Sequence, residues 1–158
     1  MENYTFIQIY TMRKLAIIKL FIVTGMLFFG FEGKAQAPEN WTSKQLVEPS
    51  ELATTISTKT DVPLIISVGP SANIPNSIDI GMVNNTAGLS KLKAQLKNLA
   101  KDKKIVIYCG CCPFEHCPNV RPAIDALKEL KFTNYYLLNL PHNIKKDWID
   151  KGYPISKS

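Results

Sequence analysis

Short apolar runs alternate along the chain with segments of helical hydrophobic periodicity. The runs at 64–68, 105–108 and 134–138 are rich in β-branched, leucine and aromatic residues, and we expect each to form a strand. Between and after them, apolar side chains recur at spacings of three and four residues. This alternation predicts an α/β fold, in which helices cover both faces of a small, mostly parallel central sheet.

Four helices are expected in this pattern. A proline suited to a first turn predicts a helix from Pro49 to about residues 60–61. A leucine at every third or fourth position predicts an amphipathic helix over 88–100. Two further helices are expected near the end of the chain: one carrying Ala123, Ile124, Leu127 and Leu130, and a short one over 143–151. The stretch 71–88 is rich in Asn, Ser, Gly and Pro, so we expect an irregular connection with one short strand at 78–80.

The N-terminal segment has the layout of a signal peptide. Arg13, Lys14 and Lys19 precede an apolar run over 20–31, and Ala35-Gln36-Ala37 follows it. The sequence therefore predicts a signal peptide over 1–37 and one domain over 38–158. We expect an exported protein, periplasmic or extracellular, that is soluble and has no stable membrane span after cleavage. An uncleaved membrane anchor is the alternative.

Composition narrows the class of protein. With 158 residues, 46% hydrophobic and 20% charged, the chain is neither disordered nor fibrous and has room for one domain. The net charge of +6 comes mainly from lysines scattered along the sequence, with no basic block interleaved with aromatic residues. This distribution favours a solvated surface and argues against a nucleic-acid partner.

All four cysteines lie within nine residues, at Cys109, Cys111, Cys112 and Cys117. Disulfides that stabilise exported domains usually close longer loops, so we expect this cluster to be a reactive site. Cys109 directly follows the strand expected at 105–108, and ligands bind beyond the carboxyl ends of such strands. The positive end of the next helix is expected to lower the pKa of Cys109 and favour its thiolate.

Other residues of this loop are candidates for supporting roles. Arg121 places a fixed positive charge near the start of the following helix, and a protonated His116 would add another. Asn119 is expected to cap or open that helix, and Glu115 to face water.

Several segments together resemble a rhodanese-like domain. They are Ile105 to Cys109, Arg121-x-Ala123, Ala126-Leu127 and the tail Trp148-x-x-x-Gly152-Tyr153-Pro154. The tail is the most specific of these, and the resemblance extends from about residue 41 to 155.

This resemblance implies a sulfurtransferase. Cys109 would take sulfane sulfur from a small donor, hold it as a persulfide and pass it to a thiol or another nucleophilic acceptor. Arg121, Cys117 and His116 complete the candidate catalytic set, with Cys117 as the preferred resolving thiol. The loop expected to surround the anion contains Gly110, Cys111, Cys112, Phe114, Glu115 and Asn119. No cofactor and no particular partner protein are implied.

The sequence also departs from the family pattern. Eleven residues separate Cys109 from Arg121, where a common rhodanese loop has five. The family's usual Asp-Val-Arg after the second strand is represented by Ser67-Val68-Gly69. A different substrate is therefore implied, and thiosulfate is not assigned as the donor.

Three alternatives remain for the same loop. The four thiols and His116 are soft ligands that would suit Cu(I) or Zn, although structural zinc sites normally draw ligand pairs from separated segments. The C-x-x-C formed by Cys109 and Cys112 is shared with thiol-disulfide oxidoreductases, although here it lies late in the fold. An inert, disulfide-tied loop on a binding module is the third alternative.

Overall fold

A five-stranded parallel sheet forms the centre of the described part of the chain. The computed structural model describes residues 41–70 and 74–156. The strand order is β1-β5-β4-β2-β3, and every neighbouring pair is parallel. The strands are β1 (Leu46–Val47), β2 (Leu64–Ser67), β3 (Ile78–Asp79), β4 (Ile105–Tyr108) and β5 (Tyr135–Leu138). This arrangement confirms the predicted parallel sheet and places β4 at its centre.

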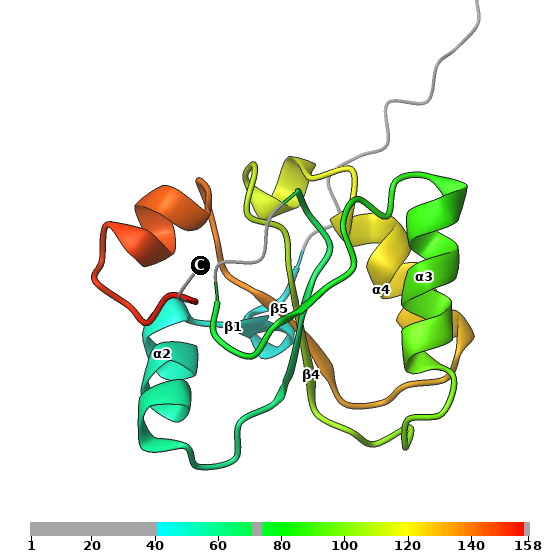
Figure 1. Cartoon of the computed structure of the whole chain (residues 1–158), viewed down its shortest axis with the longest axis horizontal. Helices are drawn as coiled ribbons and strands as arrows, with labels where there is room; N and C mark the ends of the chain where they lie inside the picture. Colours follow the sequence, from blue (N-terminus) through cyan, green and yellow to red (C-terminus); the bar gives the residue numbers. More distant parts are fainter. Residues whose placement is uncertain (1–40, 71–73, 157–158) are drawn as a thin grey trace, which may run out of the picture. The chain divides into compact units, whose positions relative to one another are not determined.

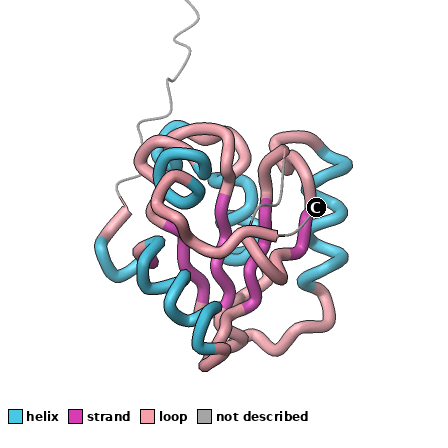
Figure 2. Tube along the Cα trace, turned by 60° about the vertical axis from the view of Figure 1, so that its left-hand side comes forward, coloured by secondary structure: helices cyan, strands magenta, loops and turns pink. Residues whose placement is uncertain are grey.

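Helices cover both faces of this sheet, as the sequence predicted. The helices are α2 (Pro49–Thr58), α3 (Thr86–Leu96) and α4 (Val120–Glu129). Three short turns accompany them: η1 (Ser43–Gln45), η2 (Phe114–His116) and the π-helical turn η3 (Lys145–Ile149). In Figure 1, α2 lies on one side of the strands while α3 and α4 lie on the other, and Figure 2 shows the strands enclosed between helices.

The side chains of β4 alternate between two hydrophobic cores. Ile105 and Ile107 pack in the core shared with α3 and α4, whereas Val106 and Tyr108 pack in the core shared with α2 and η3. All four side chains are fully buried, which is why this strand is a continuous apolar run in the sequence. Cys109 continues the alternation and faces the α3–α4 core.

The C-terminal tail closes the core on the α2 side. Trp148 is fully buried, and its indole N–H donates to the carbonyl of Pro154 at 2.7 Å. The ring of Tyr153 meets it edge to face at 5.3 Å between centroids. The Trp-x-x-x-Gly-Tyr-Pro segment is therefore a packed closure of the domain.

Several element boundaries differ from those predicted. Helix α3 begins at Thr86, before the predicted residue 88, because the Asn85 side chain accepts a 2.9 Å hydrogen bond from the amide of Gly88. It ends at Leu96, and 97–99 form a turn in place of the predicted last helical residues. The helix expected over 143–151 is reduced to the single turn η3.

Two further differences concern short elements. Helix α2 ends at Thr58, slightly before the predicted end, because Lys59 takes up a left-handed conformation with φ of 57°. Strand β1 has only two residues, too few to give an alternating pattern in the sequence.

The predicted signal peptide over 1–37 lies outside the described residues. Within the described ranges, no helix has the length and apolar character needed to cross a membrane.

Candidate active site

Cys109 lies at the carboxyl end of β4, between the ends of β2 and β5. Its neighbour Tyr108 is in register with Ser67 of β2, and the amide of Val68 donates to the Tyr108 carbonyl at 2.9 Å. A Cβ atom added at Gly69 would lie 2.8 Å from the Cys109 sulfur. Gly69, which follows β2, therefore leaves the space that the Cys109 sulfur occupies.

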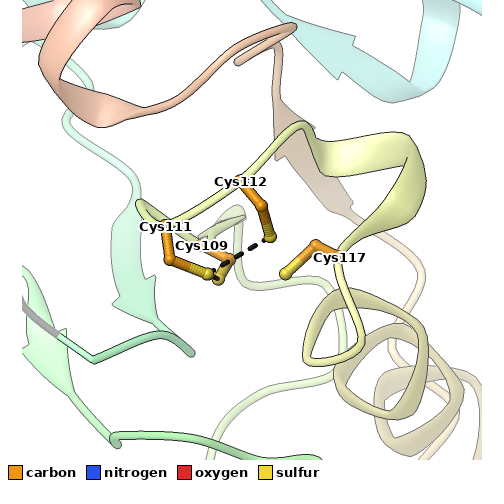
Figure 3. A group of neighbouring side chains, drawn as sticks. All are labelled: Cys109, Cys111, Cys112 and Cys117. Atoms are coloured by element: carbon orange, nitrogen blue, oxygen red, sulfur yellow. Dashed lines mark hydrogen bonds between the residues drawn. The ribbon is translucent and has the colours of Figure 1, made fainter.

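The loop after Cys109 brings all four sulfurs together, as Figure 3 shows. We call this group the cysteine cluster: the thiols of Cys109, Cys111, Cys112 and Cys117, whose sulfurs all lie within 4.8 Å of one another. The sulfur of Cys111 is 3.3 Å from that of Cys109 and 3.2 Å from that of Cys112. Cys109 and Cys117 are buried, whereas Cys111 is exposed and Cys112 half-buried, so the cluster is reached from the side of Cys111.

Contacts with the C-terminal half of the chain hold the loop in place. The Gly110 carbonyl accepts a 3.0 Å hydrogen bond from the amide of Ile144, and the amide of Phe114 donates to the Leu140 carbonyl at 3.2 Å. Phe114 itself is buried in the α3–α4 core. The amide of Phe114 thus has a carbonyl partner, and the membership of Phe114 in the anion-binding loop stays a prediction.

The pKa values of Cys109 and Cys117 are moved in opposite directions. The neighbouring Cys109 side chain is the main cause that lowers the pKa of Cys117 to about 5. Burial opposes this effect, whereas the amides of Asn119 and Val120 at the start of α4 support it. The neighbouring Cys117 side chain, together with burial, raises the pKa of Cys109, although the amide of Cys111 acts in the opposite direction. Burial is also the main cause that raises the pKa of Cys112 to about 12.

These shifts correct the sequence analysis, which expected the thiolate on Cys109. The helix terminus does stabilise a thiolate, but its amides lie against Cys117. Cys109 lies eight residues earlier in the loop, where Cys117 and burial raise its pKa.

Asn119 links the cysteine cluster to the segment that precedes α3. Its side-chain Nδ2 lies 3.8 Å from the sulfur of Cys109, and its Oδ1 accepts a 3.0 Å hydrogen bond from the amide of Asn84. The residue is 2% exposed. Asn119 occupies the N-cap position of α4, as expected, but its side chain makes no capping hydrogen bond, because it is turned towards Cys109 and Asn84.

The other candidates lie around η2. Arg121 is half-buried and donates from Nη2 to the Glu115 carbonyl at 3.4 Å. Glu115 and His116 are exposed, as predicted for Glu115. The contribution of Arg121 or His116 to the charge at the sulfurs stays a prediction.

Sequence reasoning missed three residues that shape this site. Gly69 makes room for the Cys109 sulfur, Val120 supplies an amide to Cys117, and Ile144 holds the Gly110 carbonyl. The first two had a usable signal: Gly69 directly follows a buried strand, and Val120 lies near the start of a helix. Ile144 had none, because it is 34 residues away from Gly110 in the sequence.

Comparison with known proteins identifies the architecture. No protein-family model matches the sequence, and none of the curated proteins does. The solution structure of the rhodanese-like domain from an Anabaena protein matches with a TM-score of 0.52 and 14% identity, covering 72% of this chain and 80% of that one. The single-domain sulfurtransferase RDL2 of Saccharomyces cerevisiae matches with a TM-score of 0.50 and 18% identity, covering 71% of this chain and 95% of that one. The chain has the rhodanese fold.

This finding confirms the fold that the sequence resemblance implied. In the rhodanese fold of this chain, Cys109 follows the central strand, which is where the resemblance implies the catalytic cysteine. The distinguishing feature is the longer loop, which adds three sulfurs around that position. The site thus offers two buried sulfurs, those of Cys109 and Cys117, with two more accessible thiols beside them.

Proposed function

We propose that the protein is a sulfurtransferase that carries sulfane sulfur as a persulfide on Cys109. The observation that carries this proposal is the position of the Cys109 sulfur, beyond the central strand of a rhodanese fold and within 4.8 Å of three further sulfurs. The neighbour from Saccharomyces cerevisiae, itself described as a sulfurtransferase, supports the same chemistry. The partners are a small sulfur donor and a thiol or other nucleophilic acceptor.

Loading begins with attack by the Cys109 sulfur on the sulfane sulfur of the donor. As the new S–S bond forms, the bond between the sulfane sulfur and the rest of the donor breaks, and the leaving group takes its electron pair. The thiol proton of Cys109 passes to Cys117, whose sulfur lies within 4.8 Å of the Cys109 sulfur. The amide of Cys111, which acts to lower the pKa of Cys109, would also stabilise negative charge on the persulfide.

Unloading has two routes on this geometry. An external thiolate can attack the terminal sulfur, forming a persulfide on the acceptor and returning the electron pair to Cys109. In the second route, the Cys117 thiol, which took up the proton during loading, gives that proton to the terminal sulfur as its own sulfur attacks the inner sulfur, so that a Cys109–Cys117 disulfide forms and hydrosulfide leaves. The sulfane sulfur is then reduced while the two cysteines are oxidised, and an external thiol reduces the disulfide before the next cycle.

The proposal is tested by intact mass after incubation of the reduced protein with a polysulfide. The wild type should gain one sulfur that a thiol reductant removes, and Cys109→Ser should gain none. Cys111→Ser is the matched control, because Cys111 is exposed and its variant should fold and still take up sulfur. An undiminished sulfur load in a folded Cys109→Ser protein would falsify the proposal.

We also propose that this chemistry takes place outside the cytoplasm. The charged flank, apolar run and Ala-x-Ala sequence of residues 1–37 support export. Mass analysis of the protein recovered from fractionated cells should give a chain that begins at Pro38. A full-length chain confined to the cytoplasm would contradict this localisation.

A further inference from the structure

We infer that the cysteine cluster binds one thiophilic d10 cation, Cu(I) or Zn(II), through the sulfurs of Cys109, Cys111, Cys112 and Cys117. Four sulfurs bound tetrahedrally at metal–sulfur distances of about 2.3 Å are about 3.8 Å apart. In this protein two of the sulfur–sulfur distances are 3.3 and 3.2 Å, and none exceeds 4.8 Å. These sulfur–sulfur distances lie on both sides of the tetrahedral value, so small side-chain rotations suffice to enclose an ion.

The ligand set favours soft metals. It consists of sulfur alone, because His116, which the sequence offered as a further ligand, is not part of the group of side chains within 4.8 Å. Thiolate ligands select Cu(I) and Zn(II) over hard cations such as Mg²⁺ or Ca²⁺. Coordination displaces the protons that remain on the thiols, so the binding consumes no oxidant or reductant.

The single loop that carries the ligands is already fixed by the rest of the fold. Sequence spacing argued against a zinc site because such sites usually draw ligands from two separated segments. In the structure, the hydrogen bonds Ile144–Gly110 and Asn84–Asn119 anchor the loop to two other parts of the chain. The ligands are therefore brought together by the fold, without requiring the metal to assemble them.

The surroundings suit a metal–thiolate centre. Cys109 and Cys117 lie in the α3–α4 core with Phe114 and Val120, which exclude water from one side of the cluster. The exposed Cys111 provides the route by which an ion enters. A dry inner side and one open edge are the arrangement expected for a site that takes up and releases its metal.

Metal binding and sulfur carriage exclude each other on these atoms. A coordinated Cys109 sulfur donates to the ion the lone pair with which it would attack a sulfane sulfur. This consequence rests on the proposed sulfurtransferase function, whereas the binding itself does not. A metal-loaded protein should therefore fail to gain sulfur until a chelator removes the ion.

The inference is tested by titrating the reduced, metal-free protein under anaerobic conditions. One arm adds Cu(I) buffered by bicinchoninate, and the other adds Zn(II) in competition with a chromogenic chelator. We expect one equivalent bound in at least one arm, with thiolate-to-metal charge-transfer absorption in the ultraviolet in the Cu(I) arm. Binding in one arm alone assigns the ion, whereas no stoichiometric binding in either arm overturns the inference.

Variants separate the cluster from adventitious binding. Cys111→Ser and Cys117→Ser should each weaken binding by about tenfold or more, whereas His116→Ala should leave it unchanged. Unchanged metal affinity in whichever of these two cysteine variants folds would overturn the site. Because Cys111 is exposed, its variant keeps the test valid even if Cys117→Ser does not fold. Sulfur loading of the same metal-free preparation, measured by mass, reports on the proposed function separately.

Discussion

The amide of Ile144 donates a 3.0 Å hydrogen bond to the carbonyl of Gly110, directly after the cysteine that ends β4. A Cβ atom added at Gly110 would lie 2.9 Å from Cγ2 and 3.0 Å from Cβ of Ile144. The backbone of the cysteine loop thus lies against the C-terminal segment with no space for a side chain. This contact makes the loop geometry depend on residues far from it in the sequence.

Gly110→Ala should therefore destabilise the protein by about 1–3 kcal/mol, because the methyl group overpacks the contact with Ile144. The free energy of unfolding in urea measures the effect. In the double variant with Ile144→Ala, which removes Cγ1 and Cγ2, the alanine at 110 should cost less than it does alone. Additive costs would show that Ile144 is not the residue against which position 110 packs.

Gly69→Ala should reduce sulfur uptake by about tenfold or more, because its methyl group would displace the Cys109 sulfur from its position. The rate of sulfur gain after addition of polysulfide, followed by intact mass, measures this effect. The stability cost of Gly69→Ala should shrink in a Cys109→Ala background, which lacks the sulfur. An equal cost in both backgrounds would mean that the sulfur and the methyl group do not compete for space.

Asn119→Ala should cost about 1 kcal/mol in stability, because it removes a buried side chain whose Oδ1 accepts a hydrogen bond from the amide of Asn84. It should also slow sulfur uptake, because the Nδ2 group beside the Cys109 sulfur is removed. Asn85→Ala is the matched control: it removes the exposed cap of α3 and should cost about 1 kcal/mol without changing sulfur uptake. Equal rates of sulfur uptake by the two variants would show that Asn119 has no role in the site.

Asp147 makes the stability of the folded protein depend on pH. Burial raises the pKa of its carboxyl, but hydrogen bonds from the amides of His142 and Asn143 and from the His142 ring outweigh burial, so the pKa is lowered overall. Because the pKa is lower in the folded state, the ionised carboxylate stabilises the fold at pH values above the unfolded-state pKa of about 3.9. That stabilisation is lost as the pH falls through the folded pKa.

Asp147→Ala should accordingly cost about 1–3 kcal/mol at pH 7, and the difference from the wild type should narrow towards pH 3. Urea unfolding at the two pH values measures the change. Asp150→Ala, which removes only an exposed ion pair with Lys145, should cost less than about 1 kcal/mol at pH 7. A cost of Asp147→Ala that is independent of pH would contradict the assignment.

The sequence was most informative where one side-chain pattern determines the structure. The apolar run at 105–108 predicted a buried central strand, and its end therefore located Cys109. It was least informative about contacts between distant segments. The bond between Asn119 and Asn84 joins residues 35 apart, and the pKa of Cys117 is lowered by Cys109 and by amides at the start of α4, which only the folded loop brings together.

The reactive sulfurs all belong to the segment between the last residue of β4, Tyr108, and the first residue of α4, Val120. No cysteine comes from the sheet or from a helix, so the scaffold and the chemistry are separable parts of the chain. An insertion or deletion confined to this one connection would change which sulfurs meet, while the strands and helices on either side keep their places. Specificity in such a protein can diversify by exchange of a single loop.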